Sequence, residues 1–370
     1  MLERLYATNY RCLVNFEFRP SGKQLIIGRN GVGKTAVLDV LAALREFAVG
    51  GTPCDSFFMG KTRTRWQDVS EQRFELDVNG NDGTYRYLLV ADEVGHPSRA
   101  RVKRETLEFN KWPLFRFEQG EISLFSDQQQ TKPGAQFNSD WHRSGLAIVE
   151  SRKDNTKLTW FKKWLDGLVQ VQINPWTMRA RSEEEARNPA KDLSNFADWY
   201  RHLRLDSGNA IFETLTTLRE ALQGFEALDA KEAGLEVRVL QATFRSPTGK
   251  PVDLPFSELS EGQRVLIALY VLLYCVVGSG RTLLIDEPDN FVALAEIQPW
   301  LMKLLDRVDE QGAQVILVSH HPELLDQMAS QGGVLLDRPN GGETRLVPFA
   351  PPDDTGLKAS EIIARGWESV

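Results

Sequence analysis

Cysteine is scarce in this chain, which has only three in 370 residues: Cys12, Cys54 and Cys275. Their spacing forms neither the paired pattern of a disulfide framework nor the ligand pattern of a zinc site. The sequence therefore excludes both as the basis of the fold. Because few and unpaired cysteines are typical of a reducing compartment, we expect a cytoplasmic protein.

Long apolar runs are equally rare. The longest one, residues 265–277, is too short to span a bilayer and is typical of a buried core helix. The first residues carry no signal-peptide pattern, and the sequence shows neither heptads long enough for a coiled-coil arm nor an internal repeat. We therefore expect no association with a membrane.

An excess of positive charge is missing as well. The net charge is −7, and the composition of 42% hydrophobic and 26% charged residues is ordinary for a globular chain. This acidic balance argues against binding to nucleic acid by bulk electrostatics, although it is compatible with a local basic patch.

What the sequence does contain is a glycine-rich loop, Gly28–Thr35, with the spacing of a phosphate-binding loop. Residues 24–27 predict a short buried strand before it, and apolar residues recur at helical spacing after it. Such a loop directs backbone N–H groups and a helix N-terminus at anionic oxygens. We expect Lys34 to neutralise the β- and γ-phosphates of a nucleotide and the Thr35 hydroxyl to hold Mg²⁺.

A second group of motifs follows much later in the chain. Residues 259–263, Leu-Ser-Glu-Gly-Gln, precede an apolar helix for which Ser260 is the expected N-cap. The apolar strand 282–285 then ends in Asp286 and Glu287. Asp286 is suited to bind Mg²⁺, and Glu287 is suited to activate the attacking water.

One further strand, residues 315–318, ends in Ser319-His320-His321. We expect His320 to sense the γ-phosphate, with His321 as the competing candidate. Because strands and helices alternate here, we expect a mostly parallel sheet, and ligands of such sheets lie beyond the carboxyl ends of the strands.

These four motifs, in this order, resemble the Walker A, signature, Walker B and switch-histidine motifs of ABC-type ATPases. Asn9-Tyr10-Arg11 and the sequence 286–290 resemble the branch that includes SMC, RecF and OLD-family proteins. The resemblance implies a homodimer in which two heads enclose two ATP molecules with Mg²⁺. Each signature motif would then face the other subunit's phosphate loop.

The resemblance also implies a set of site residues. Glu287, His320 and Lys34 would be catalytic, and Thr35 and Asp286 would bind the metal. The nucleotide-binding residues implied are Arg11, Asn30, Gly31, Val32, Gly33, Lys34, Thr35, Ala36, Ser260 and Gly262.

The expected fold is α/β, a P-loop NTPase of the ABC-ATPase head type, with a mostly parallel core sheet, an antiparallel β lobe and an inserted helical subdomain. We expect the N-terminal part of the head with the β lobe at 1–128, and a helical insert at 129–234. The C-terminal part of the head would occupy 235–350, and a tail with a short helix at 357–364 would occupy 351–370.

Two features depart from the family pattern. The glutamine of the Q-loop cannot be chosen among Gln67, Gln72, Gln119 and residues 128–130. The sequence after His320 is also too short for a nuclease domain of the OLD type. We therefore expect an ATP-hydrolysing head that homodimerises and regulates a separate effector, such as a nuclease, in DNA repair or in defence against phages or plasmids.

The alternative hypothesis is a nucleotide-gated clamp on DNA. Its candidate residues are basic and fall in two short stretches, Lys61, Arg63, Arg65 and Arg99, Arg101, Lys103, Arg104. A solvated strand face is the competing interpretation of these charges. A transporter ATPase subunit is disfavoured. The tryptophans of the middle region, Trp160, Trp164, Trp176 and Trp199, predict packing in the core or an interface rather than stacking on bases.

Overall fold

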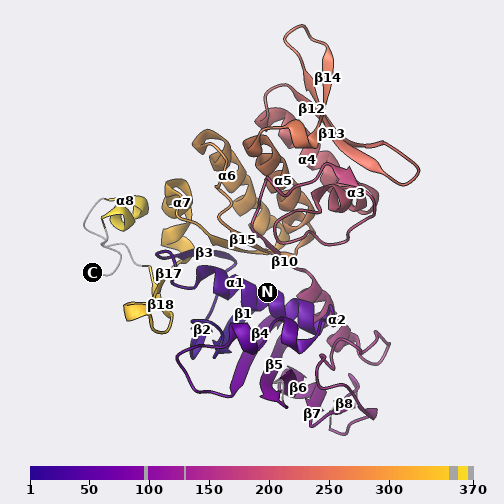
Figure 1. Ribbon diagram of the computed structural model, residues 1–370, viewed down its shortest axis with the longest axis vertical. Coiled ribbons are helices and arrows are strands. Elements are labelled where there is room, and N and C mark those ends of the chain that lie inside the picture. The colour runs from indigo at the N-terminus through magenta and orange to yellow at the C-terminus, as the bar shows by residue number, and fades with distance from the viewer. Residues whose placement is uncertain (96–98, 129–130, 350–356, 366–370) are drawn as a thin grey trace. The chain divides into compact units, whose positions relative to one another are not determined.

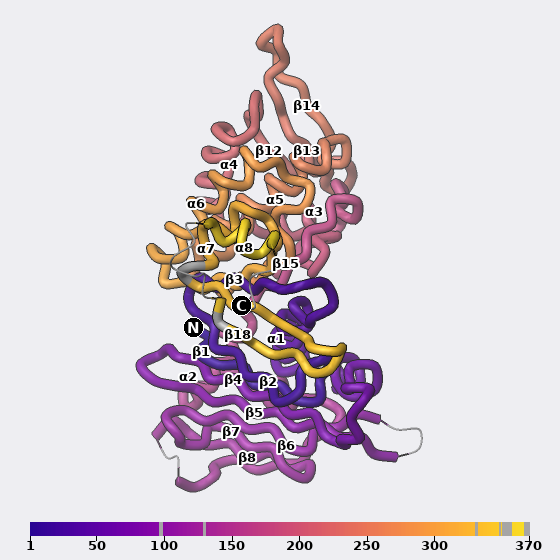
Figure 2. The backbone as a smooth tube through the Cα atoms, turned by 90° about the vertical axis from the view of Figure 1, so that its left-hand side faces the viewer, coloured from indigo at the N-terminus to yellow at the C-terminus, as the bar shows by residue number. Residues whose placement is uncertain are grey.

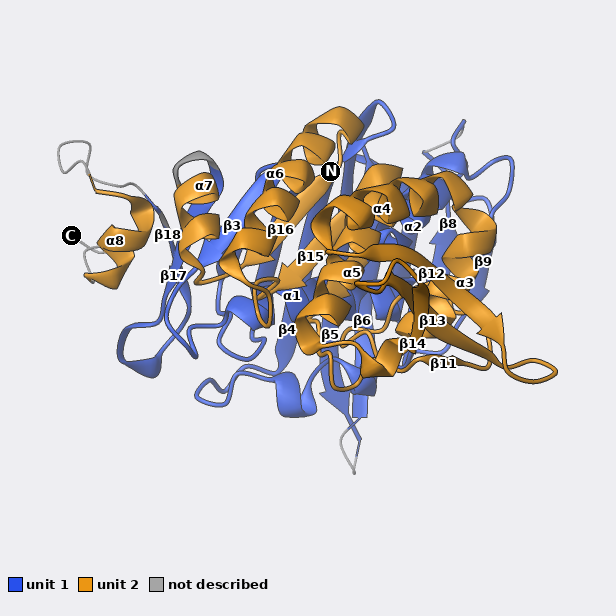
Figure 3. Cartoon of the chain, turned by 90° about the horizontal axis from the view of Figure 1, so that it is seen from above, with its two compact units in different colours: residues 1–168, 332–350 blue, residues 169–331, 351–370 orange. Residues whose placement is uncertain are grey.

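The computed structural model describes residues 1–95, 99–128, 131–349 and 357–365 (Figure 1). The chain forms two compact units. Unit 1 comprises residues 1–168 and 332–350, and unit 2 comprises residues 169–331 and 351–370 (Figure 3). Unit 1 contains the glycine-rich loop, and unit 2 contains the signature, Asp286 and the histidines.

The elements of unit 1, in chain order, are β1 (Leu2–Thr8), β2 (Phe16–Phe18), β3 (Lys23–Ile27), α1 (Lys34–Ala48), η1 (Cys54–Ser56), η2 (Gly60–Thr62), β4 (Glu71–Gly80), β5 (Gly83–Val94), β6 (Arg99–Phe109), β7 (Trp112–Glu118), β8 (Glu121–Leu124), β9 (Gln136–Asn138), α2 (Thr156–Asp166), β17 (Gly333–Asp337), η5 (Pro339–Gly341) and β18 (Arg345–Pro348). After β10 (Leu168–Val171) at the boundary, unit 2 contains β11 (Arg181–Ser182), α3 (Phe196–Asp206), α4 (Gly208–Ala221), β12 (Phe225–Glu232), β13 (Arg238–Arg245), β14 (Pro251–Pro255), η3 (Phe256–Glu258), α5 (Glu261–Cys275), η4 (Val277–Ser279), β15 (Thr282–Asp286), α6 (Leu294–Gln311), β16 (Gln314–Val318), α7 (Pro322–Gly332) and α8 (Ala359–Ala364).

An eight-stranded antiparallel sheet dominates unit 1, in the order β2-β1-β4-β5-β6-β7-β8-β9. Figure 2 shows strands β4 to β8 side by side. Strands β4 and β5 form a hairpin, and its turn residues Asn81 and Asp82 have φ of 52° and 61°, which suits a two-residue turn between twisted strands. Alternate residues of β4 face the core, since Phe74, Leu76 and Val78 are fully buried. The expected β lobe is therefore confirmed.

The phosphate loop lies between a buried strand and an amphipathic helix of the same unit. Strand β3 is buried from its second residue onward, and it pairs in parallel with β17. On α1 the apolar residues at helical spacing are all buried, as the sequence predicts: Val37, Leu38, Leu41, Leu44 and Phe47. Strand and helix thus hold both ends of the loop.

Unit 2 is built on the parallel pair β15 and β16, in which every residue is buried. Helix α6 packs against α5, where the Trp300 indole donates to the carbonyl of Leu269 over 3.0 Å. Both strands are short, and between Thr282 and Asp286 in β15 and after Gln314 in β16 every residue is apolar, which is the composition of a parallel sheet covered on both faces. The α/β fold class is confirmed.

Within the described residues, one helical stretch is long and apolar enough to cross a membrane, judged by length and composition alone. It runs from Glu261 to Ser279, because η4 continues α5 beyond the apolar run seen in the sequence. In its most apolar window, 72% is buried inside the protein, as in the core helix of a globular unit.

The region 225–255 differs from the sequence prediction. The sequence patterns marked neither β12 nor β14, and Leu235 is fully exposed between strands β12 and β13. The three strands form an antiparallel sheet with β11. Their polar, partly exposed sequences lack the strict alternation that marks a strand buried on one face.

The tryptophans expected to pack in the core mostly do so. Trp199 is fully buried, and Trp160 stacks on Tyr85 with ring centres 4.9 Å apart. Trp176 is the exception, with 70% of its side chain exposed. At the C-terminus the expected short helix is α8, and its Ser360 N–H donates to Asp326 of α7 over 2.9 Å.

One buried carboxylate organises the interior of unit 1. Glu105 on β6 has no exposed surface, and its Oε1 accepts from Tyr87 and Ser144 over 2.8 and 2.6 Å. Its Oε2 accepts from the N–H groups of Gly145 and Leu146. Burial raises the pKa of this carboxyl. Because the folded protein then holds the proton more tightly than the unfolded chain, this group lowers stability as pH rises above the ordinary glutamate range.

We expect Glu105→Gln to lower the free energy of unfolding by about 1–3 kcal/mol, because an amide NH₂ would face N–H donors. Urea unfolding at about pH 5 and about pH 7 checks this, and the deficit shrinks at the higher pH since only the wild type carries the ionising carboxyl. Glu121→Gln, exposed on β8, is the matched control. If Glu105→Gln has the same unfolding free energy as the wild type, the hydrogen bonds of Glu105 do not contribute to stability.

Candidate nucleotide site

Three glycines of the phosphate loop adopt the left-handed backbone region. Gly28, Gly31 and Gly33 have φ of 148°, 82° and 105°. A Cβ at Gly28 would lie 2.4 Å from the Leu336 carbonyl oxygen, and one at Gly33 would lie 2.6 Å from the Cys12 sulfur. A Cβ at Gly31 would meet nothing within 4 Å. Neighbouring segments therefore pack closely against the loop at Gly28 and Gly33, and no atom lies close to Gly31 on the side of a Cβ.

Lys34 folds back on the loop at the start of α1. The Lys34 ammonium donates to the carbonyls of Gly28 and Arg29 over 2.6 and 3.1 Å, and the residue is 7% exposed. Gly33, the N-cap of α1, has no side-chain capping bond, and the first turn has no acidic residue. Free of a side-chain cap and of acidic repulsion, this helix start suits a phosphate.

The turn that follows β1 lies against this loop. Asn9 and Arg11 have φ of 61° and 52°. The Arg11 N–H donates to the Thr62 carbonyl over 2.6 Å, and its guanidinium donates to Asp39 of α1 over 2.6 Å. Arg11, which the resemblance implied as a nucleotide residue, is thus held beside the loop helix.

Asn9 is fully buried and joins the β1 turn to the segment before β4. Its amide donates to the carbonyls of Val69 and Glu71, and its Oδ1 accepts from the Thr64 N–H over 3.1 Å. Gln72, one of the Q-loop candidates, is also buried, and it bridges the Asn9 carbonyl and the Met59 N–H, each over 2.7 Å. Both side chains position the backbone around the site.

The hairpin formed by β17 and β18 supplies contacts that the sequence did not reveal. Thr344 donates through its hydroxyl to the Val32 carbonyl over 2.7 Å and through its N–H to the Cys12 carbonyl over 2.9 Å. Arg338 donates to the Gly31 carbonyl over 3.3 Å. No motif marks these residues, because they follow the switch histidines in a stretch of ordinary polar composition.

In unit 2 the signature motif has the predicted helix cap. Ser260 is the N-cap of α5, its oxygen accepts from the Gln263 N–H over 3.2 Å, and Gln263 completes a capping box. A Cβ at Gly262 would lie 2.9 Å from the Phe291 carbonyl oxygen. The signature therefore packs closely on the segment that follows Glu287.

Asp286 and Glu287 end strand β15 in different conformations. Asp286 is in the strand and 3% exposed. Glu287 has a φ of 52°, held by its N–H donating to the Val318 carbonyl over 2.8 Å, while its carboxylate accepts from Asn290 over 2.8 Å. A non-glycine residue in this region costs about 1–3 kcal/mol, and such strain clusters at functional sites.

The two histidines after β16 are in different environments. The backbone N–H of His321 donates to the Ser319 hydroxyl over 2.9 Å. The His321 Nδ1 accepts from the Glu323 N–H at the start of α7. Ser319 in turn donates to Asp289 over 2.6 Å. His320 is exposed. His321 thus helps to order the start of α7.

The structure thus brings the predicted residues together in two groups. Unit 1 gathers Arg11 with the loop 28–36, and unit 2 gathers Ser260 and Gly262 with the segment after Glu287. The assignment of these residues to nucleotide and metal remains a prediction.

Most of the basic residues proposed for a DNA clamp are engaged in ion pairs. Five of the seven pair with acidic neighbours: Arg63 with Asp68 and Glu93, Arg99 with Asp55, Arg101 with Asp92, Lys103 with Glu71 and Arg104 with Glu118. Lys61 and Arg65 are exposed. Pairing neutralises the surface potential that a phosphate backbone would need, so the solvated-face interpretation is favoured.

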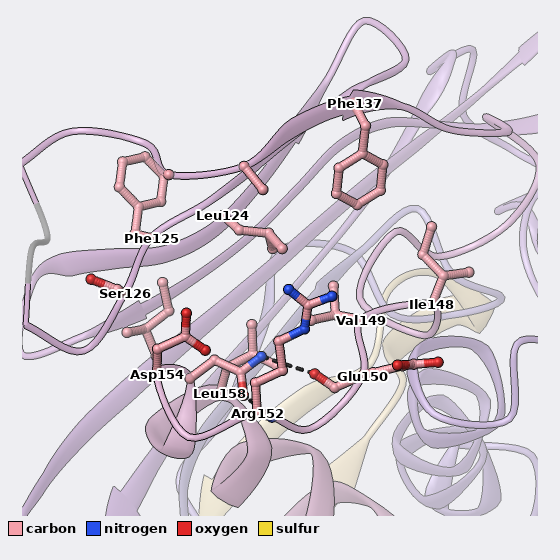
Figure 4. A pocket seen from close by; sticks show the side chains of 14 residues that line it. Leu124, Phe125, Ser126, Phe137, Ile148, Val149, Glu150, Arg152, Asp154 and Leu158 are labelled. Atoms are coloured by element: carbon pink, nitrogen blue, oxygen red, sulfur yellow. Dashed lines mark hydrogen bonds between the residues drawn. The ribbon is translucent and has the colours of Figure 1, made fainter.

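A cavity of about 450 Å³ lies elsewhere in unit 1, beside the edge strand β9 (Figure 4). Its wall is largely apolar, with Leu124, Phe137 and Leu158 among the lining residues, and Arg152 points into it. No residue predicted to bind nucleotide lines it, so it is separate from the phosphate loop.

The fold and the loop define a P-loop NTPase of the ATPase-head class. The chain belongs to the family described as "AAA domain, putative AbiEii toxin, Type IV TA system", whose model matches residues 25–326. AAA-domain families are, in general, nucleotide-binding ATPases.

A solved structure shows the same fold. The SmcHead bound to the C-winged helix domain of ScpA is similar with a TM-score of 0.55 at 13% identity, covering 94% of this chain and 98% of that chain. The SMC head domain from Thermotoga maritima aligns with a TM-score of 0.48 at 14% identity, covering 95% of this chain and 99% of that chain. No curated protein matches the sequence.

We expect Gly33→Ala to disrupt the phosphate loop. The added methyl would meet the Cys12 sulfur at 2.6 Å and the Thr344 hydroxyl at 2.8 Å, at a φ of 105°. We expect a loss of roughly 1–3 kcal/mol in unfolding free energy, measured by urea unfolding. Gly31→Ala is the comparison, since it adds only backbone strain in open space. If both variants lose the same unfolding free energy, the contacts of Gly33 with Cys12 and Thr344 do not limit the size of the residue there.

Proposed function

We propose that this chain binds and hydrolyses ATP with Mg²⁺, dimerises around ATP, and thereby regulates a separate effector protein. The observation that carries the proposal is the phosphate loop of unit 1. Three of its glycines have left-handed backbone that other residues rarely adopt, its lysine donates to the loop's own carbonyls, and its helix starts without a side-chain cap.

Each loop residue has a definite task in this proposal. Lys34 exchanges its two carbonyl acceptors, Gly28 and Arg29, for phosphate oxygens, so that binding replaces hydrogen bonds that already exist. The backbone from Asn30 to Ala36 directs N–H groups at the same oxygens. Bound Mg²⁺ would neutralise phosphate charge, with Thr35 and Asp286 as its protein ligands.

Glu287 is proposed to orient and deprotonate the attacking water, with His320 near the γ-phosphate. Glu287 has left-handed backbone, whereas Asp286, one residue earlier, belongs to strand β15. The bond from Asn290 fixes one carboxylate oxygen and leaves the other for water. Two adjacent carboxylates thereby take different roles.

The signature motif is proposed to complete the site of a second copy. Ser260 and Gly262 lie at the N-terminus of α5, where a hydroxyl, backbone N–H groups and the helix dipole favour an anion. The exposed rings of Trp176 and Phe291 meet edge to face with centres 5.0 Å apart, and Phe291 belongs to the segment that packs against Gly262. Exposed aromatic pairs of this kind are enriched at protein interfaces.

A change of assembly acts only if another molecule responds to it. We propose a separate effector protein, such as a nuclease, in a cytoplasmic system of DNA repair or of defence against phages or plasmids. The family description names a putative toxin of a toxin–antitoxin system, which favours the defence setting.

We expect Glu287→Gln to abolish ATP hydrolysis, by at least about 100-fold, while keeping ATP binding. With ATP and Mg²⁺ its mass in solution should shift from monomer to dimer, because the trapped nucleotide is no longer removed. Light scattering and phosphate release measure the two effects. Glu220→Gln, an exposed change on α4, is the control. Wild-type hydrolysis by Glu287→Gln would refute the role of this carboxylate.

A mixing experiment tests whether two copies share each site. Lys34→Ala lacks a working loop, and Ser260→Arg lacks a working signature, so each variant alone should be inactive. Mixed, they form some heterodimers with one intact composite site, and we expect part of the ATPase activity to return. If the mixture stays as inactive as its components, the sites are not shared between copies.

A further inference from the structure

An exposed tryptophan lies beside the phosphate loop. Trp66 is 47% exposed, and it belongs to the turn in which the Gln67 N–H donates to the Thr64 carbonyl. Single exposed tryptophans are common, but this one is held in place from both sides.

The backbone of the Trp66 turn is fastened to the turn after β1. The Thr64 N–H donates to the buried Asn9 side chain over 3.1 Å, and the Thr62 carbonyl accepts from the Arg11 N–H over 2.6 Å. Tyr10 and Arg63 form a further β-bridge between the segments. Since the same β1 turn carries Cys12 against Gly33, the tryptophan is positioned relative to the loop.

Arg338 connects the ring directly to the loop. Its guanidinium lies over the Trp66 ring, 5.0 Å from the centroid, and donates to the Gly31 carbonyl over 3.3 Å. Its other nitrogens donate to the carbonyls of Gly341 and Gly342, so the guanidinium is fixed. The ring centre therefore lies within about 10 Å of the Gly31 carbonyl oxygen.

We propose that Trp66 is the base-stacking residue of the nucleotide site, with Arg338 as its positioning residue, and that the site selects purine nucleotides. Arg338 covers one face of the ring, and the exposed remainder of the indole is available to a flat ligand. The phosphates bind the loop and the base stacks on Trp66, since a nucleotide carries these groups at opposite ends of its ribose. A purine offers more stacking area than a pyrimidine.

This inference rests on the proposed function, because it assumes that phosphates occupy the loop. It adds what the loop alone cannot give, a preference among nucleotides. Backbone N–H groups recognise phosphate whatever the base, whereas an indole contributes only when a base is present.

The test compares ADP, CDP and inorganic pyrophosphate, which need no hydrolysis, by calorimetric titration of the full chain. We expect Trp66→Ala to weaken ADP binding roughly ten-fold or more and to leave pyrophosphate binding unchanged. The preference for ADP over CDP should shrink in the same variant. Trp66→Phe retains a ring and should recover most of the affinity, and Arg338→Ala should weaken ADP more than pyrophosphate.

Trp112→Ala is the matched control, because Trp112 is 51% exposed in the same unit, on β7. Unchanged ADP binding by Trp66→Ala would overturn the inference. An equal loss of affinity for ADP and pyrophosphate in Trp66→Ala would also overturn it. Trp66 would then stabilise the phosphate loop rather than bind the base, and the proposed function would stand. If the wild type binds neither ADP nor pyrophosphate, the proposed function fails together with the inference.

Discussion

The phosphate loop depends on one constraint, the close approach of other segments to its glycines. Gly33 leaves no room for a Cβ between the Cys12 sulfur and the Thr344 hydroxyl, and Gly28 leaves none against the Leu336 carbonyl. Glycine tolerates both the contact and the left-handed backbone, but it adds no stability of its own. The loop therefore keeps its shape through the β1 turn and the β17–β18 hairpin, which press on it from outside.

Surrounding structure also holds an unfavourable backbone conformation at the end of β15. Glu287 holds a backbone conformation that an isolated chain would avoid, and Phe291 a few residues later has a φ of 71°. The Phe291 carbonyl packs on Gly262, so the two strained residues lie at the ends of the segment that leads from the candidate catalytic carboxylate to the signature contact. Stable structure around them, the buried pair β15 and β16 and the apolar helix α5, supports that strain.

Charge on unit 1 is balanced rather than accumulated. Arg101 and Arg104, two of the basic residues that suggested a DNA surface, pair with carboxylates on neighbouring strands, and the buried carboxylate of Glu105 accepts from hydroxyl and backbone donors. Pairs across adjacent strands stabilise a sheet face, which explains why basic residues recur along β6 without forming a basic patch. The positions of charged residues in a sequence therefore do not reveal the sign of the electrostatic potential at the folded surface.

The sequence by itself determined the phosphate loop with its strand and helix, the cap at Ser260, and the apolar strand that ends in Asp286 and Glu287. Those features are set by neighbouring residues, since periodicity, capping and loop chemistry act over a few positions. The weakly alternating strands β12 and β14 escaped prediction because their burial is partial. Only the tertiary structure decided which distant residues surround the loop. Arg338 meets Gly31 across 307 positions of sequence, and Asn9 holds a segment 55 to 62 residues away. Such contacts leave no local pattern, because any polar residue of suitable length at those positions looks alike until the chain has folded.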